Sequence, residues 1–65
     1  MIQLTKLNGV QFWLNPHLIE TIEATPDTMI IMISGTHVIV KETVPDVINK
    51  IIEYRKKLGI NRQEE

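Results

Sequence analysis

The sequence feature that most constrains the fold is the apolar run MIIMI at residues 29–33, in the middle of a 65-residue chain. A strand with one face in water alternates apolar and polar residues, whereas this run is apolar on both faces. The β-branched residues from Thr28 to Val40 favour strands over a helix. The chain therefore needs a fold, or a partner, that covers both faces of one strand.

The chain length limits how much core can provide that cover. A chain this short forms one domain at most, and its core supplies only about 3–5 kcal/mol. There is no cysteine, so disulfides and thiolate zinc sites are excluded. The net charge of −1 gives no basic field for nucleic acid, and no apolar run approaches the roughly 20 residues of a membrane span. We expect a cytoplasmic domain over residues 1–60 without membrane insertion, followed by a polar, frayed tail over 61–65.

Turn signals divide the first forty residues into short segments. Asn8-Gly9 predicts a two-residue type I′ hairpin, and Ser34-Gly35 predicts a second tight hairpin. Asn15-Pro16 and Pro26-Asp27 predict two further turns, the latter of type I. The stretch after Pro16 also suits two helical turns, but its β-branched residues favour a bent strand. The predicted strands are residues 2–7, 10–14, 19–25, 28–33 and 36–41.

The hydrophobic period changes to 3.6 in the last third of the chain, which predicts a helix. Thr43 is a suitable N-cap, and Pro45 lies in the first turn, where a missing amide donor costs nothing. Gly59 is the predicted C′ residue, with Ile60 making the accompanying apolar contact. Glu53 and Lys57 have the spacing of an i,i+4 ion pair. The predicted apolar stripe consists of Val44, Val47, Ile48, Ile51, Ile52 and Leu58.

Together these elements predict an α+β fold. About five short antiparallel strands form a curled sheet or half-barrel, and one C-terminal helix covers one face of it. If Met29, Ile31 and Ile33 face the helix, Ile30 and Met32 point the other way. Two solutions remain open for that second face: the sheet curls around a second small core, or another subunit covers it. Exposed contiguous apolar surface usually marks a contact site.

The side chains predicted to form a contact surface follow from this assignment of faces. By alternation, Trp13 lies opposite Phe12 and points outward if Phe12 is in the core, and tryptophan is enriched at protein contact sites. Self-association is expected because a small core gains stability from a partner. The predicted interface residues are Trp13, Ile30, Met32, Val38 and Val40.

No catalytic, cofactor-binding or metal-binding residues are predicted. The sequence lacks a phosphate-binding glycine loop and a nucleophile elbow. Ser34 and His37 are better explained as a turn serine and an exposed strand histidine than as nucleophile and base. Glu20 and Glu23 face opposite ways in a strand, so they do not form an acid–base pair. We therefore expect a non-enzymatic interaction module without a cofactor.

Several segments of the chain resemble the FlbD/SwrD family of small bacterial flagellar and swarming-motility proteins. They are LTKLNG at residues 4–9, LNPHLIETIEATPDT at 14–28, GTHVIVKE at 35–42 and VINKIIEYRKK at 47–57. The ordered series covers nearly the whole chain and is specific, whereas each piece alone is weak. His17 stands where an acidic residue is usual, and Pro45 is a proline within the helix start. Neither departure threatens the resemblance.

The resemblance implies a cytoplasmic accessory factor, located at the flagellar base, that supports motor power or torque and swarming. Motor or stator components are the implied partners, and no enzymatic activity, cofactor or active site is implied. The alternative from a different class is a small nucleic-acid-binding regulator of motility genes. That alternative requires a face combining basic and aromatic residues, which the sequence supplies only in part.

Overall fold

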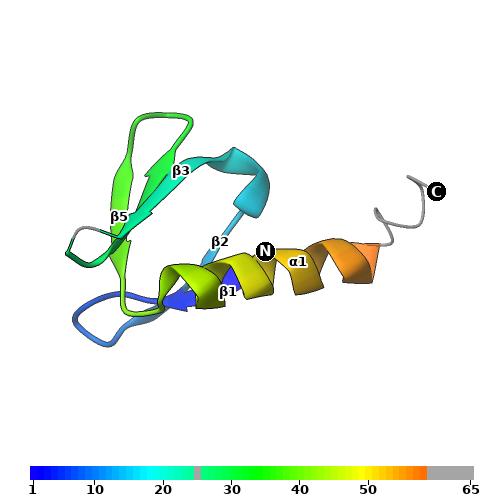
Figure 1. Cartoon of the computed structure of the whole chain (residues 1–65), viewed down its shortest axis with the longest axis horizontal. Helices are drawn as coiled ribbons and strands as arrows, with labels where there is room; N and C mark the ends of the chain where they lie inside the picture. Colours follow the sequence, from blue (N-terminus) through cyan, green and yellow to red (C-terminus); the bar gives the residue numbers. More distant parts are fainter. Residues whose placement is uncertain (25, 59–65) are drawn as a thin grey trace.

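The computed structural model describes residues 1–24 and 26–58. In this part of the chain, five antiparallel strands in two sheets precede one long helix, which confirms the predicted α+β class (Figure 1). One sheet pairs β1 with β2, and the other has the strand order β3-β4-β5. The elements are β1 (Ile2–Thr5), β2 (Gln11–Leu14), the 3-10 helix η1 (Pro16–Leu18), β3 (Ile19–Ala24), β4 (Thr28–Met32), β5 (His37–Val40) and α1 (Val44–Leu58).

Both glycine-containing hairpins have three-residue loops, so the predicted two-residue type I′ turn at Asn8-Gly9 is wrong. The Lys6 amide donates to the Val10 carbonyl at 2.8 Å, and the Gly9 amide donates to the Lys6 carbonyl at 2.9 Å. Only glycines have positive φ among the described residues, whereas a type I′ turn needs it at Asn8 too. Asn8 instead accepts a hydrogen bond from the Val10 amide through its side chain. A type I turn followed by a left-handed glycine fits this pattern.

Substituting Gly9 tests this turn geometry. Gly9 has φ +92°, and an added Cβ would meet nothing within 4 Å. Only backbone strain therefore opposes a side chain, and we expect Gly9→Ala to lower the unfolding free energy by about 1–2 kcal/mol. Gly9→Asn should cost less, because asparagine tolerates the left-handed region. Urea denaturation of both variants measures the difference, and equal losses would contradict a strain-based explanation.

The segment after Pro16 is a strand preceded by one short 3-10 turn. Asn15 caps η1, its side chain accepting a hydrogen bond from the His17 amide. The pairing of β3 with β4 shifts between Ile19 and Thr21, and this irregularity accounts for the predicted bend. The predicted type I turn at Pro26-Asp27 includes Thr25, which lies outside the described residues.

The two sheets curl around one shared core, as the half-barrel prediction requires. Lys6 bridges to Val40, and the Lys41 amide donates to the Thr5 carbonyl at 2.8 Å, so the end of β1 joins the end of β5. Within the described residues no ladder joins β2 to β3, and the half-barrel stays open there. The buried core comes from both sheets and the helix and consists of Ile2, Leu4, Leu14, Ile30, Val40 and Val47.

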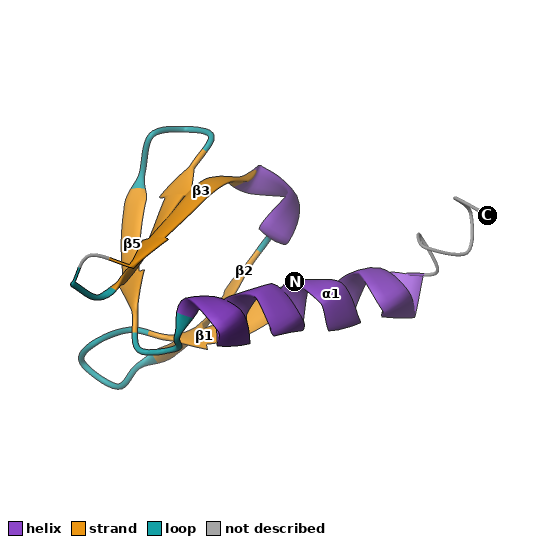
Figure 2. Cartoon of the chain, in the orientation of Figure 1, coloured by secondary structure: helices purple, strands orange, loops and turns teal. Residues whose placement is uncertain are grey.

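The helix begins as predicted but buries a narrower stripe. The Thr43 hydroxyl accepts a hydrogen bond from the Asp46 amide at 3.3 Å, which makes Thr43 the N-cap. Val47 is fully buried, and Ile51 and Tyr54 pack against the core beside it. The exposed members of the predicted stripe are Ile48, Ile52 and Leu58. They are exposed because α1 packs mainly on β1 and β3 and continues past the strands (Figure 2).

Two smaller predictions concern the end of the helix. Glu53 pairs with Lys56 at 3.8 Å, one residue nearer than the predicted partner Lys57, and both side chains are well exposed. Such a pair contributes little stability. The predicted cap at Gly59 and Ile60, and the tail over residues 61–65, lie outside the described residues.

Candidate functional site

The predicted assignment of the two faces of β4 is wrong. Ile30 and Val40 are 0% and 1% exposed, and both lie in the core. Met32 and Val38 are partly buried and pack against the same core. These four side chains therefore face inward, and Ile30 and Val40 offer no surface to a partner. Because the run is apolar on both faces, its sequence does not alternate and does not indicate which face points inward.

The opposite side of the three-stranded sheet is the surface that the chain leaves partly uncovered. Register places Glu23, Met29 and Ile39 in one row across the three strands. The next row contains Thr21, Ile31 and His37. We call these six residues the outer sheet face. Three of its members are apolar: Met29 and Ile31 are half-buried, and Ile39 is 43% exposed.

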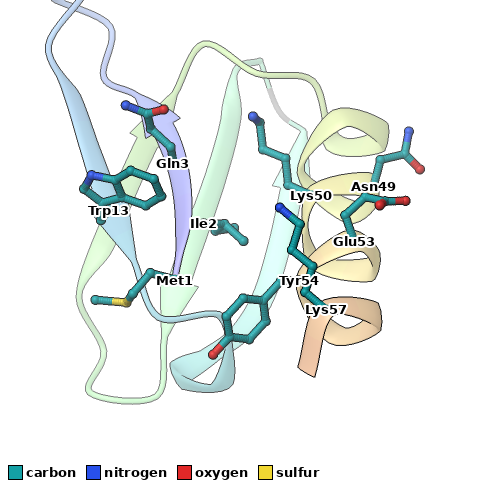
Figure 3. A pocket seen from close by; sticks show the side chains of 9 residues that line it. All are labelled: Met1, Ile2, Gln3, Trp13, Asn49, Lys50, Glu53, Tyr54 and Lys57. Carbon is teal, nitrogen blue, oxygen red and sulfur yellow. The ribbon is translucent and has the colours of Figure 1, made fainter. Parts of the chain in front are cut away.

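A second candidate surface is an open groove of about 310 Å³ between the β1–β2 sheet and α1. Trp13 on β2 is 62% exposed and pairs across the strands with Gln3. On the other side, α1 extends three side chains toward the β1–β2 sheet: Lys50, Tyr54 and Lys57 (Figure 3). The remaining lining comes from Met1, Ile2, Asn49 and Glu53. The predicted outward position of Trp13 therefore agrees with the structure, which adds an aromatic and a basic wall opposite it.

The aromatic wall of the groove is held in place by the neighbouring turn. The His17 and Tyr54 rings contact edge to face, with their centroids 5.7 Å apart. Tyr54 also packs against the core at the buried side of α1. Phe12, the neighbour of Trp13, packs inward and has the Lys6 ammonium 5.5 Å from its ring centroid. The groove is thus formed by side chains that the fold itself orients.

One carboxylate is tied into the fold close to the helix start. Glu42 accepts hydrogen bonds from the Thr5 amide at 2.9 Å and from the Thr5 hydroxyl at 2.8 Å. Burial works to raise the pKa of Glu42, but the Thr5 hydrogen bonds, its own amide and the charge of Lys50 together lower it. Glu42 therefore joins β1 to the segment between β5 and α1, which is a structural role.

The groove was not predicted from the sequence because its walls are distant along the chain. Lys50 and Tyr54 lie on a helix that also contains many other polar residues, and nothing local pairs them with β2. A helical stripe drawn through Val47, Ile51 and Tyr54 would have placed Tyr54 beside the core. The outer sheet face could have been predicted from two polar residues. Glu23 and His37 mark the outer side, and the strand register would then assign their cross-strand neighbours to the same side.

The described residues contain no group of three or more histidine, cysteine, aspartate or glutamate side chains placed to hold a metal ion.

No helix in the described ranges is both long enough and apolar enough to cross a membrane.

Fold and surfaces together define a small α+β domain: an open half-barrel with one helix, bearing a partly exposed apolar sheet face and an aromatic groove. A family model described as flagellar and swarming motility proteins, FlbD, matches residues 1–59. The chain belongs to this family, which confirms the resemblance found in its sequence. No curated protein and no solved structure gives a significant match to the chain.

Proposed function

We propose that this motility protein is a non-enzymatic cytoplasmic accessory factor of the flagellum that supports motor power and swarming by binding other proteins. Its proposed partners are a second copy of the chain and a motor or stator component at the flagellar base. The observation that supports this proposal is the outer sheet face. In the folded domain, Met29 and Ile31 on β4 remain only half-buried, and they lie beside the exposed Ile39. Apolar surface of this kind is typical of contact sites.

The composition of the outer sheet face suits a protein partner. Met29 and Ile31 lie on its middle strand, and the polar Glu23 and His37 lie at opposite corners. An apolar centre with polar edges is the usual anatomy of a protein contact. Covering it would also add stability to a core that supplies only about 3–5 kcal/mol.

The decisive experiment is a swarming and torque assay in the bacterium that encodes this chain. Deletion should abolish swarming and lower motor torque, and wild-type protein should restore both. We expect Ile39→Glu to fail to restore them, because it places a charge beside Met29 in the apolar part of the outer sheet face. The matched control is Ile48→Glu on α1: Ile48 is 44% exposed, close to the 43% of Ile39. Circular dichroism establishes that both variants fold.

The outcomes separate the parts of the proposal. Unchanged swarming and torque on deletion would eliminate the motility role. Normal swarming of Ile39→Glu would eliminate the outer sheet face as the functional surface. Sedimentation of the wild type as a monomer at tens of micromolar would eliminate self-association, while leaving contact with a motor component to be detected by cross-linking in cells.

The nucleic-acid alternative is favoured by one observation, the position of Lys50 and Lys57 beside Trp13 and Tyr54. Aromatic platforms flanked by cations bind single strands. Against it, the net charge is −1 and Glu53 also lines the groove. Binding to flagellar transcripts that weakens steeply with salt would support this alternative, and salt-insensitive or undetectable binding would remove it.

A further inference from the structure

The groove between β2 and α1 combines apolar and basic side chains in a way that restricts its partner. Trp13, Met1 and Tyr54 supply apolar and aromatic surface, and Lys50 and Lys57 both extend toward it (Figure 3). We propose that this groove binds an acidic helix of a partner protein, with one large apolar side chain inserted between two carboxylates. The inference rests on the proposed function as a protein-binding factor and specifies the chemistry of one partner.

The two lysines set the spacing of the carboxylates. Lys50 and Lys57 are seven residues apart on α1, which is about 10 Å along the axis and almost two full turns. They therefore lie on the same side of the helix. Acidic residues at positions i and i+7 of a partner helix have the same separation and also share a face. A residue at i+3 or i+4 of that helix lies between them and faces the groove.

Trp13 and Tyr54 provide the contact for the apolar residue between the carboxylates. Trp13 is 62% exposed on one side of the groove, and a tryptophan at this exposure has much surface left to bury. Tyr54 is already held by the edge-to-face contact with His17 at 5.7 Å. The side of the groove formed by Tyr54 is thus ordered before a partner binds, so less conformational entropy is lost on binding.

The charges of the described residues favour an acidic protein over other anionic partners. Within residues 1–24 and 26–58, neither Lys50 nor Lys57 forms an ion pair, although the charge of Lys50 also lowers the pKa of Glu42. Glu53 lines the rim and pairs with Lys56. Lys50 and Lys57 can each pair with one carboxylate of a partner, so the groove suits a ligand with two negative charges. Anionic membranes favour clusters of about 4–8 cations, and single strands need a basic track.

The tryptophan itself reports on the groove, because Trp13 is the only tryptophan in the chain. The probe is a synthetic alanine-based helical peptide with glutamate at i and i+7 and leucine at i+4. Titration into the full-length protein should shift the Trp13 emission to shorter wavelength and saturate. The matched peptide with glutamine at both glutamate positions should bind about fivefold more weakly, as expected for two solvent-exposed charge pairs.

Protein variants test the same contacts from the other side. The double variant Lys50→Gln/Lys57→Gln should lose about fivefold in affinity for the glutamate peptide. The control Lys41→Gln/Arg55→Gln makes the same change in net charge at residues that neither line the groove nor pair with a residue that does, and it should bind like the wild type. Trp13→Ala, followed by anisotropy of a labelled peptide, should weaken binding at least tenfold, as truncation of a hot-spot tryptophan does. Circular dichroism monitors folding throughout.

Several results would overturn the proposal. They are no Trp13 shift with the glutamate peptide at millimolar concentration, equal losses in the groove and control variants, or equal binding of both peptides. Tighter binding to phosphatidylglycerol vesicles or to a single-stranded oligonucleotide than to the peptide would assign the groove to a lipid or nucleic-acid partner instead. None of these results changes the swarming outcome for Ile39→Glu, so failure here is distinguishable from failure of the proposed function.

Discussion

Replacing Ile30 with alanine is expected to remove most of the folding stability of this protein. Ile30 is 0% exposed and lies between Ile22 on β3 and Val38 on β5, on the inward side of the sheet. Truncating a fully buried isoleucine costs about 2–5 kcal/mol, because both apolar contacts and packing are lost. A core of this size supplies only about 3–5 kcal/mol. We therefore expect Ile30→Ala to be largely unfolded, or to melt tens of degrees below the wild type.

The matched control for this prediction is the next residue along the strand. Ile31 has the same side chain on the same strand but points to the outer sheet face, where it is only half-buried. Ile31→Ala should lower the unfolding free energy by about 1 kcal/mol and leave the circular dichroism spectrum unchanged. Thermal and urea denaturation of the two variants measure the difference. Equal destabilisation would contradict the assignment of inward and outward faces in β4.

The elements of the fold follow from the sequence to a large extent, because their signals are local. Alternation predicts the first two strands, and the change of period after Thr43, with its N-cap, predicts the helix. The glycines mark both hairpins, but the loop length depends on which backbone groups pair, and so the type I′ assignment fails at Asn8. Local patterns state where a turn lies more reliably than they state its geometry.

The surfaces are less predictable, because they depend on contacts between distant segments. The inward face of β4 is decided by its register with β3 and β5, and an all-apolar run contains no information about it. The predicted interface therefore included Ile30 and Val40, which are core residues. Trp13 is predicted to point outward because it shares a face of β2 with the polar Gln11, opposite Phe12 and Leu14. Its position opposite Tyr54 depends on how α1 packs, which no short-range pattern specifies.

Glu42 supplies the second large effect, a pH-dependent part of the stability. Its two hydrogen bonds from Thr5 form to the charged carboxylate, and its pKa in the folded protein is lower than the ordinary 4.5. The stabilisation is therefore fully present above the ordinary pKa and is lost as the pH falls from there through the lower pKa of the folded state.

At neutral pH we expect Glu42→Gln to cost about 1–2 kcal/mol, a range that allows for solvent screening of a partly exposed group. The difference between wild type and variant should shrink as the pH is lowered toward 3, and urea denaturation at several pH values measures it. Thr5→Val should reduce the same difference, since it removes one donor to the carboxylate. A gap that stays constant with pH would mean that Glu42 stabilises the fold by packing, with its charge playing no part.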